Sequence, residues 1–156
     1  MGSLIWGTYT WVLFHGMAEK INDKYFIEEK NNIISLIKKV CGVLPCPKCI
    51  NHASQALVNI DKIQTKTQLI DFLYDFHNIV NKRRDIENFD KSKLEKYKYV
   101  DFKKLLKIWL TVFKVQGQVP QLMYITMNRE LVKKEVFSYI KNNLYKFTPS
   151  EVSNKA

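Results

Sequence analysis

The chain has 156 residues and a formal net charge of +10, with 25 basic and 15 acidic side chains. Its hydrophobic content of 46% excludes a disordered chain, and its length favours one domain with at most an appendage. With only 5 glycines and 4 prolines, and no run of 18 apolar residues, the composition favours a helical fold without a transmembrane segment.

Apolar periodicity predicts four helices in the first part of the chain. Residues 8–21 repeat apolar side chains at helical spacing, and Phe26 to Val43 carries a single apolar stripe. Pro47 suits the first turn of a third helix, which would start directly after Cys46. Thr67 to Arg84 gives the clearest helical pattern of the chain.

The second part of the chain predicts two more helices. Residues 85–98 are polar and predict a loop that holds at most a short helix. Asp101 to Val115 is amphipathic, Gly117 to Pro120 should interrupt the helical pattern, and Arg129 to Tyr145 predicts a last helix. No segment alternates apolar and polar residues with a period of two, so the predicted fold class is all-α.

The most informative motif is Cys46-Pro47-Lys48-Cys49. A two-residue gap lets two thiols close a small, reversible disulfide, which suits electron transfer better than scaffolding. At a helix N-terminus, Cys46 would lie at the positive end of the backbone dipole, which lowers a thiol pKa. The motif therefore indicates redox chemistry through a bound cofactor.

A zinc site is the alternative interpretation of the same residues. Cys41, Cys46, Cys49 and His52 would supply four ligands, with gaps of four, two and two residues. Such a chain would be a non-enzymatic module whose basic surface binds nucleic acid. Cys41 lies on the apolar stripe of its helix, where a free cysteine acts as a small core residue. This favours redox chemistry, although the residues alone leave both interpretations open.

Polar side chains gather on the helix predicted for 67–84. His77 and Asn81 are four residues apart and share a face, and Asn78 and Lys82 share the adjoining one. They predict a pocket wall in which the ring and amides hold a heterocycle, while Lys82, Arg83 and Arg84 hold phosphates. A structural histidine with surface amides would give the same pattern.

Trp11 and His15 are also four residues apart, on the first predicted helix. An indole and an imidazole on one face can flank a planar ring. An aromatic stripe that belongs to the core is the alternative.

Taken together, these motifs resemble a known family. Trp6-Gly7-x3-Trp11-x3-His15, Cys46-Pro47-Lys48-Cys49 and His77-Asn78-x-Val80-Asn81 are similar to the Erv/ALR FAD-linked sulfhydryl oxidases, especially the short versions of large DNA viruses. The resemblance covers about residues 4–98. It implies a four-helix bundle plus a short fifth helix over residues 1–100, FAD at the mouth of the bundle, and a homodimer. Residues 101–156 would form a helical C-terminal extension of unknown role.

The resemblance also implies an enzymatic activity and a set of site residues. Dithiol oxidation would be coupled to reduction of oxygen to hydrogen peroxide. Cys46 would be the interchange thiol that meets the substrate, and Cys49 would face the flavin. The positions that match FAD contacts of the family are Gly7, Trp11, His15, His77, Asn78, Val80, Asn81, Lys82 and Arg83, and no metal is expected.

Two departures from the family pattern stand out. Many members carry a second disulfide, and the matching positions here are Tyr74 and Lys91. Closing that loop of about 17 residues would contribute roughly 3 kcal/mol in the chain-entropy model, which the extra helices could recover. An aromatic residue that the family has near the cofactor falls close to Lys98, so that Tyr97 or Tyr99 would replace it.

The remaining expectations concern partners and location. With 3 cysteines there is no second pair, so a thiol-containing protein substrate or a dithiol shuttle protein must reach Cys46 directly. The lysines are scattered without an aromatic-basic recognition motif, so no nucleic-acid partner is expected. The N-terminal residues do not form a secretory signal, and we expect a viral late protein in the host cytoplasm or the virion.

Overall fold

A computed structural model describes residues 5–115 and 123–148, and within these ranges all regular elements are helical. This confirms the predicted all-α class. The α-helices are α1 (Ile5–Lys20), α2 (Asp23–Cys41), α3 (Pro47–Ala56), α4 (Lys66–Arg83), α5 (Phe102–Val112) and α6 (Met123–Asn143). The short 3-10 helices are η1 (Ile60–Lys62), η2 (Lys91–Tyr99) and η4 (Leu144–Lys146).

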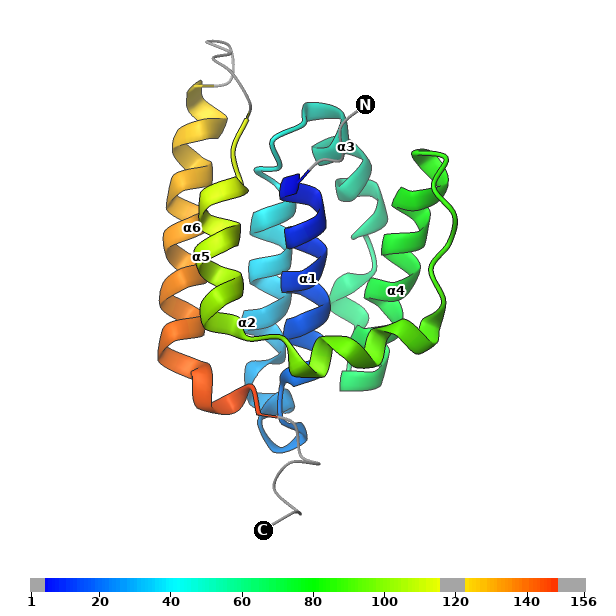
Figure 1. Cartoon of the computed structure of the whole chain (residues 1–156), viewed down its shortest axis with the longest axis vertical. Helices are drawn as coiled ribbons and strands as arrows, with labels where there is room; N and C mark the ends of the chain where they lie inside the picture. The colour runs from blue at the N-terminus through cyan, green and yellow to red at the C-terminus, as the bar shows by residue number, and fades with distance from the viewer. Residues whose placement is uncertain (1–4, 116–122, 149–156) are drawn as a thin grey trace.

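The helix α1 runs through the middle of the bundle (Figure 1). It packs against α4, α5 and η2, whereas α2 packs against α3 and α6. The segment η2 crosses the end of α1 and connects the α4 side of the bundle to the α5 side (Figure 1). None of the helices in the described ranges has the length and apolar character needed to cross a membrane.

Side-chain caps fix where several helices begin. Thr65 accepts from the backbone N–H of Gln68, and Gln68 returns a bond to the backbone of Thr65, which completes a capping box at the start of α4. At the start of α2 and of α5, the side chains of Asn22 and Asp101 accept from backbone N–H groups of the first turn, without the return bond. These bonds satisfy amide groups that would otherwise lack partners in the first turn of a helix.

The structure confirms the predicted helices but moves some of their ends. The helix α5 ends at Val112 instead of Val115, because Phe113 leaves the helical conformation and buries its ring against Trp109. The helix α6 begins at Met123, before Arg129, and its first turns expose their apolar side chains. The apolar residues of these turns therefore do not form one buried stripe, so periodicity did not predict this part of α6. The break predicted at 117–120 lies outside the described residues.

One hydrophobic core joins the two parts of the chain. Trp109 on α5 is fully buried, and its indole Nε1 donates to the hydroxyl of Thr10 on α1 at 3.1 Å. Phe102 lies so close to α1 that a Cβ on Gly16 would come within 2.9 Å of its ring. The division into residues 1–100 and 101–156 stays a prediction, and the two segments share this core.

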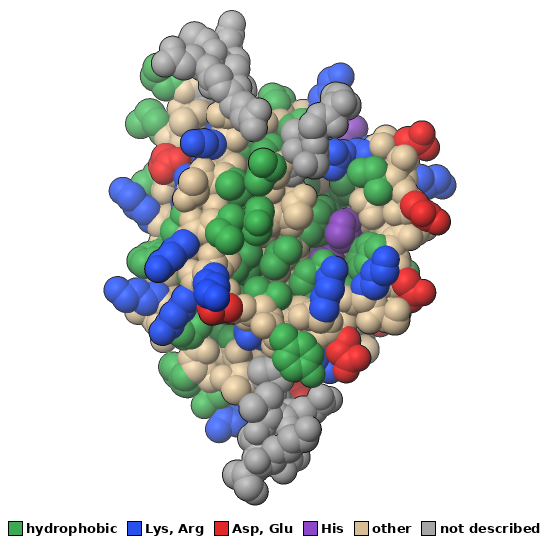
Figure 2. Space-filling model, viewed as in Figure 1, with side chains coloured by type: hydrophobic (Ala, Val, Ile, Leu, Met, Phe, Trp, Pro, Cys, Tyr) green, Lys and Arg blue, Asp and Glu red, His purple; other side chains and the backbone are tan. Residues whose placement is uncertain are grey.

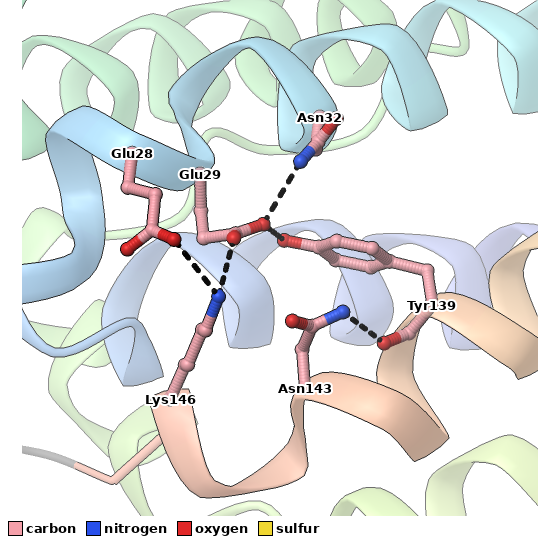
Figure 3. A network of polar contacts seen from close by, with 6 residues as sticks. All are labelled: Glu28, Glu29, Asn32, Tyr139, Asn143 and Lys146. Atoms are coloured by element: carbon pink, nitrogen blue, oxygen red, sulfur yellow. Dashed lines mark hydrogen bonds and ion pairs between the residues drawn. The ribbon is translucent and has the colours of Figure 1, made fainter.

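A buried polar network attaches the end of α6 and η4 to α2 (Figure 3). Lys146 contacts Glu29 at 2.6 Å, and the hydroxyl of Tyr139 donates to the same carboxylate at 2.6 Å. Burial raises the pKa of Glu29, but hydrogen bonds from Lys146, Tyr139 and Asn32 outweigh it and hold that pKa below its usual range. The carboxylate thus stays charged and paired, and it anchors the C-terminal helices to the bundle.

Candidate active site

The two cysteines of the motif form a disulfide at the start of α3. Cys46 is the N-cap residue in extended conformation, and its sulfur accepts from the backbone N–H of Cys49 at 3.2 Å. Pro47 occupies the first turn, where a backbone N–H would have no acceptor within the helix, so that its absence costs no hydrogen bond. The positive end of the α3 dipole would favour a thiolate at Cys46 after reduction.

An apolar cavity borders the second cysteine. Its wall includes Cys49 and the side chains of Trp11, Phe14, Phe76 and Val80. Cys46 is not part of the wall, although both cysteines are partly exposed. The pair therefore has an inner sulfur that adjoins the cavity and an outer sulfur that an external thiol can approach.

A second cavity, of about 500 Å³, lies on the other side of Trp11. Gly7, Trp11 and Arg84 line both cavities, so the first turns of α1 form a shared wall. Asn81 and Lys96 line the second cavity as well. Its volume falls in the range of ligand pockets, and its two cationic side chains suit an anionic group.

The surface view agrees with this arrangement. Figure 2 shows a band of hydrophobic side chains over α1 and α5, with histidine, lysine and arginine side chains toward α4. A ligand with a planar ring and an anionic part would find apolar walls and cations next to each other here.

Two histidines and two other aromatic rings form a continuous stack between α1, α4 and η2. Trp11 lies parallel to His77, with ring centroids 4.1 Å apart and an interplanar angle of 9°. His15 Nε2 and His77 Nδ1 share a hydrogen bond of 2.9 Å. Tyr97 stacks on His15 at 4.9 Å. Side chains from three elements, predicted separately, thus meet in one cluster.

Both histidines of this stack are held in the neutral form. Burial, helped by His77 and Lys96, lowers the pKa of His15 to about 3. Burial and Lys96 lower the pKa of His77 to about 4. With both rings neutral, one N–H can donate to the lone pair of the other ring, which is the pairing that the 2.9 Å distance requires.

Stability is expected to decrease as the pH falls from about 6.5 toward 5, because the unfolded chain then binds protons that the two folded rings do not. The pKa of each histidine is lower in the folded protein than in the unfolded chain. Its contribution to the free energy of unfolding is therefore complete above the unfolded pKa and is lost as the pH falls toward the folded pKa. The slope should reach at most about 1.4 kcal/mol per pH unit for each histidine. Urea unfolding between pH 7.5 and 5 measures it.

The control for this prediction is His77→Gln, which should reduce the slope by about half because one of two groups is removed. Burial raises the pKa of Glu19, which acts in the opposite direction and can only flatten the profile. A native protein whose stability does not change between pH 6.5 and 5 would contradict neutral, buried histidines.

The positions of the missing second disulfide are still in contact with each other. The Lys91 ammonium lies 5.9 Å from the ring centroid of Tyr74 and 2.7 Å from the carboxylate of Asp71. The hydroxyl of Tyr74 donates to the backbone oxygen of Phe89 at 3.2 Å. Polar and cation–π contacts therefore connect α4 to the following loop where the family would have a covalent bond.

Asn78 takes part in the same loop contact and lines neither cavity. Its side-chain oxygen accepts from the backbone N–H of Phe89 at 3.2 Å. The ring of Phe89 then lies 4.5 Å from His77 and 5.7 Å from His15. Asn78 and Tyr74 thus hold an aromatic lid over the histidine pair.

The remaining predicted residues differ in whether they line a cavity. Arg83 lines the first cavity, whereas Lys82 is exposed and lines neither. Of the two candidate aromatic residues, Tyr97 is 8% exposed and stacks on His15, while Tyr99 is 73% exposed. Tyr97, and not Tyr99, therefore lines the second cavity, and its place near the cofactor stays a prediction.

Sequence reasoning missed two residues of the site. Phe89 and Lys96 lie in the polar stretch that predicted a loop, and their neighbours show no helical stripe. The aromatic ring of Phe89 in a mostly polar stretch was the available signal for that residue, and nothing distinguished Lys96 from the surrounding lysines.

The geometry offers no support for the zinc alternative. Cys41 is buried, and burial raises the pKa of its thiol to about 12, while Cys46 and Cys49 are bonded to each other. His52 lines the first cavity. In residues 5–115 and 123–148, no group of three or more His, Cys, Asp or Glu side chains is arranged to hold a metal ion.

Comparisons with known proteins agree with the geometry. A model of the Erv1 / Alr family matches residues 8–100, more than half of the chain. A relative from Invertebrate iridescent virus 3, named "Putative FAD-linked sulfhydryl oxidase 096R", is 29% identical over 82 residues, which cover 51% of this chain and 55% of the relative. The match thus spans about half the length of that curated protein. No solved structure matches the chain.

Proposed function

Because the chain belongs to the Erv1/Alr family, we propose that it is an FAD-dependent thiol oxidase that forms disulfides in protein substrates and produces hydrogen peroxide from oxygen. One observation carries this proposal: the apolar cavity adjoins Cys49 and excludes Cys46. Such a division gives one sulfur to a bound cofactor and the other to an incoming thiol.

The residues around the two cavities have the chemistry that FAD requires, and the first cavity, of about 110 Å³, would have to widen to take the flavin ring. A flavin ring is planar and largely apolar, and the first cavity offers Trp11, Phe14 and Val80 next to Cys49. The other end of FAD carries a pyrophosphate, and Arg84 and Lys96 supply positive charge in the second cavity. We therefore propose that FAD binds along the wall that the two cavities share.

Each predicted FAD contact has a proposed role. Gly7 leaves space at the start of α1, where both cavities meet. The proposed ring contacts are Trp11, His77 and Val80, which line the cavities, whereas His15 lines neither cavity and is proposed to act by holding the His77 ring through their hydrogen bond. Asn81 is proposed to hydrogen-bond a polar group of FAD, Asn78 to act through the Phe89 loop, and Lys82 and Arg83 to attract the phosphates.

Thiol–disulfide exchange at Cys46 would be the first chemical step. A substrate thiolate attacks the Cys46 sulfur, so that a substrate–Cys46 bond forms, the Cys46–Cys49 bond breaks, and Cys49 leaves as a thiolate. A second substrate thiolate then attacks the substrate sulfur of this mixed disulfide, which releases oxidised substrate and Cys46. The balance is two electrons gained by the cysteine pair and two protons released from the substrate thiols.

When bound, FAD would supply a two-electron acceptor for the reduced pair and pass those electrons to oxygen. The chain would contribute position and electrostatics. The α3 dipole favours thiolate at Cys46, and the apolar wall beside Cys49 would hold the flavin ring next to that residue.

The family resemblance supports further parts of the proposal. The substrate is a thiol-containing protein or a dithiol shuttle protein, because the sequence has 3 cysteines and no second pair. We propose a homodimer in which residues 1–100 form the oxidase domain and residues 101–156 an extension. The similarity to a protein of a large DNA virus supports a viral late protein in the host cytoplasm or the virion.

An absorbance spectrum and an oxygen electrode test the proposed function. Purified protein should be yellow, carry about one flavin per chain, and consume oxygen when dithiothreitol is added. Stoichiometric zinc without flavin would instead support the non-enzymatic alternative at Cys41, Cys46, Cys49 and His52. A colourless, inert protein with an intact bundle would also contradict the oxidase.

A further inference from the structure

Arg129 on α6 is a buried cation that lines neither of the two cavities. Its side chain is 1% exposed. In the part of the chain that the structure describes, no carboxylate forms an ion pair with it, and its neighbour Glu130 pairs with Lys133 instead. Burial of a charge is unfavourable unless other groups replace its hydration.

Two consecutive backbone carbonyls bind this guanidinium. Arg129 Nε donates to the Val43 oxygen at 2.7 Å, and Nη2 donates to the Leu44 oxygen at 3.2 Å. Both carbonyls lie just beyond Gly42, the C-cap of α2, where the helix dipole is negative and favours a cation. The rigid fork of arginine can hold both oxygens at once, whereas a lysine ammonium is a single point charge.

The residues held in this way lead directly into the redox motif. Only Pro45 separates Leu44 from Cys46, and the Leu44 side chain lines the same cavity as Cys49. Fixing the two carbonyls therefore fixes the direction from which the chain enters the N-cap of α3. Small displacements of reacting groups reduce rates strongly. The direction in which the chain enters α3 therefore affects how Cys49 is placed against the cavity.

We propose that Arg129 is a positioning residue for the Cys46–Cys49 pair, and that the C-terminal extension acts on the redox centre through it. This inference rests on the proposed function for its rate effects. Residues outside the segment matched by the family model would then take part in electron transfer without contacting substrate or cofactor.

The experiment compares native protein with Arg129→Met, which keeps an aliphatic stem and removes both donors. The first readout needs no FAD: the thiol–disulfide equilibrium of the pair in glutathione buffers, followed by alkylation and mass measurement. A loosened loop presents the two sulfurs to each other less often, so the equilibrium constant for closing the disulfide should fall by about tenfold or more. The constantly reduced Cys41 adds the same mass to every sample.

The second readout is the rate at which bound flavin loses its colour after dithiothreitol is added without oxygen. Arg129→Met should slow it by about 10- to 100-fold while flavin content stays constant. Arg129→Lys can reach one carbonyl and should recover part of both effects. Lys133→Met is the matched control on α6: it removes a buried cation that binds Glu130, and both readouts should match native protein.

Native values for both readouts in a folded Arg129→Met protein would overturn the inference. If that variant does not fold, Arg129→Lys gives the result, and native behaviour there overturns it as well. Native protein that binds no flavin contradicts the proposed function instead, and the glutathione equilibrium still tests the positioning role of Arg129.

Discussion

Replacing Cys49 by serine is expected to abolish thiol oxidation and to leave FAD bound. A hydroxyl cannot form the disulfide that a substrate thiolate must attack, so turnover should fall by at least about a thousandfold. The walls of the two cavities are otherwise unchanged, and serine is close to cysteine in size. Oxygen consumption with dithiothreitol measures the loss, and the absorbance spectrum measures retained flavin.

Two variants on the same helix sharpen this experiment. Cys46→Ser should lose turnover as well, because it removes the outer sulfur that meets the substrate. Gln55→Ala changes an exposed residue of α3 and should behave as native protein. A Cys49→Ser protein that turns over at the native rate would contradict the assignment of the redox pair.

Replacing Trp109 by alanine is expected to lower the free energy of unfolding by about 3–5 kcal/mol, the range for removing a large buried aromatic side chain. The indole is fully buried and stacks on Phe113 at 4.6 Å. It also holds Thr10, which lines the first cavity. The variant should therefore lose flavin more readily, and chemical unfolding and flavin content measure the two effects.

Neighbouring substitutions separate the causes of this effect. Ile108→Ala changes a side chain that is 40% exposed on the same helix and should cost less than about 1 kcal/mol. Trp109→Phe keeps most of the ring and loses the bond to Thr10, so about 1 kcal/mol should be lost. An unfolding free energy of Trp109→Ala within 1 kcal/mol of the native value would show that α5 does not stabilise the bundle.

Helix positions were predictable because their causes are local. The apolar stripe of residues 67–84 and the Pro47 start after Cys46 depend on residues within one or two turns. Where the prediction of α5 differed, packing in the core decided the end, because the ring of Phe113 contacts Trp109 and also Trp6 of α1. The side chain of Phe113 leaves α5 to reach the core, and α6 starts early although its first turns bury little.

The candidate site was predictable to the extent that its chemistry depends on spacing. The Cys46–Cys49 pair and the pairs on α1 and α4 are each visible as short motifs. Phe89 and Lys96 were not predicted, because Phe89 lies in a loop held by contacts with Tyr74 and Asn78, and Lys96 lies in the short helix η2, whose sequence shows no apolar stripe. A loop of this kind has no periodicity from which a face can be predicted.

The sequence alone determined the all-α class, the dithiol, and the residues that resemble FAD contacts, since helix formation and disulfide closure depend on residues a few positions apart. Only the tertiary structure decided that Cys49 borders a cavity and that His15 pairs with His77. It also decided that Arg129 reaches the Val43 carbonyl, 86 residues earlier. The reason is that burial, and the partners that a buried polar group requires, are properties of packed elements and not of any single stretch.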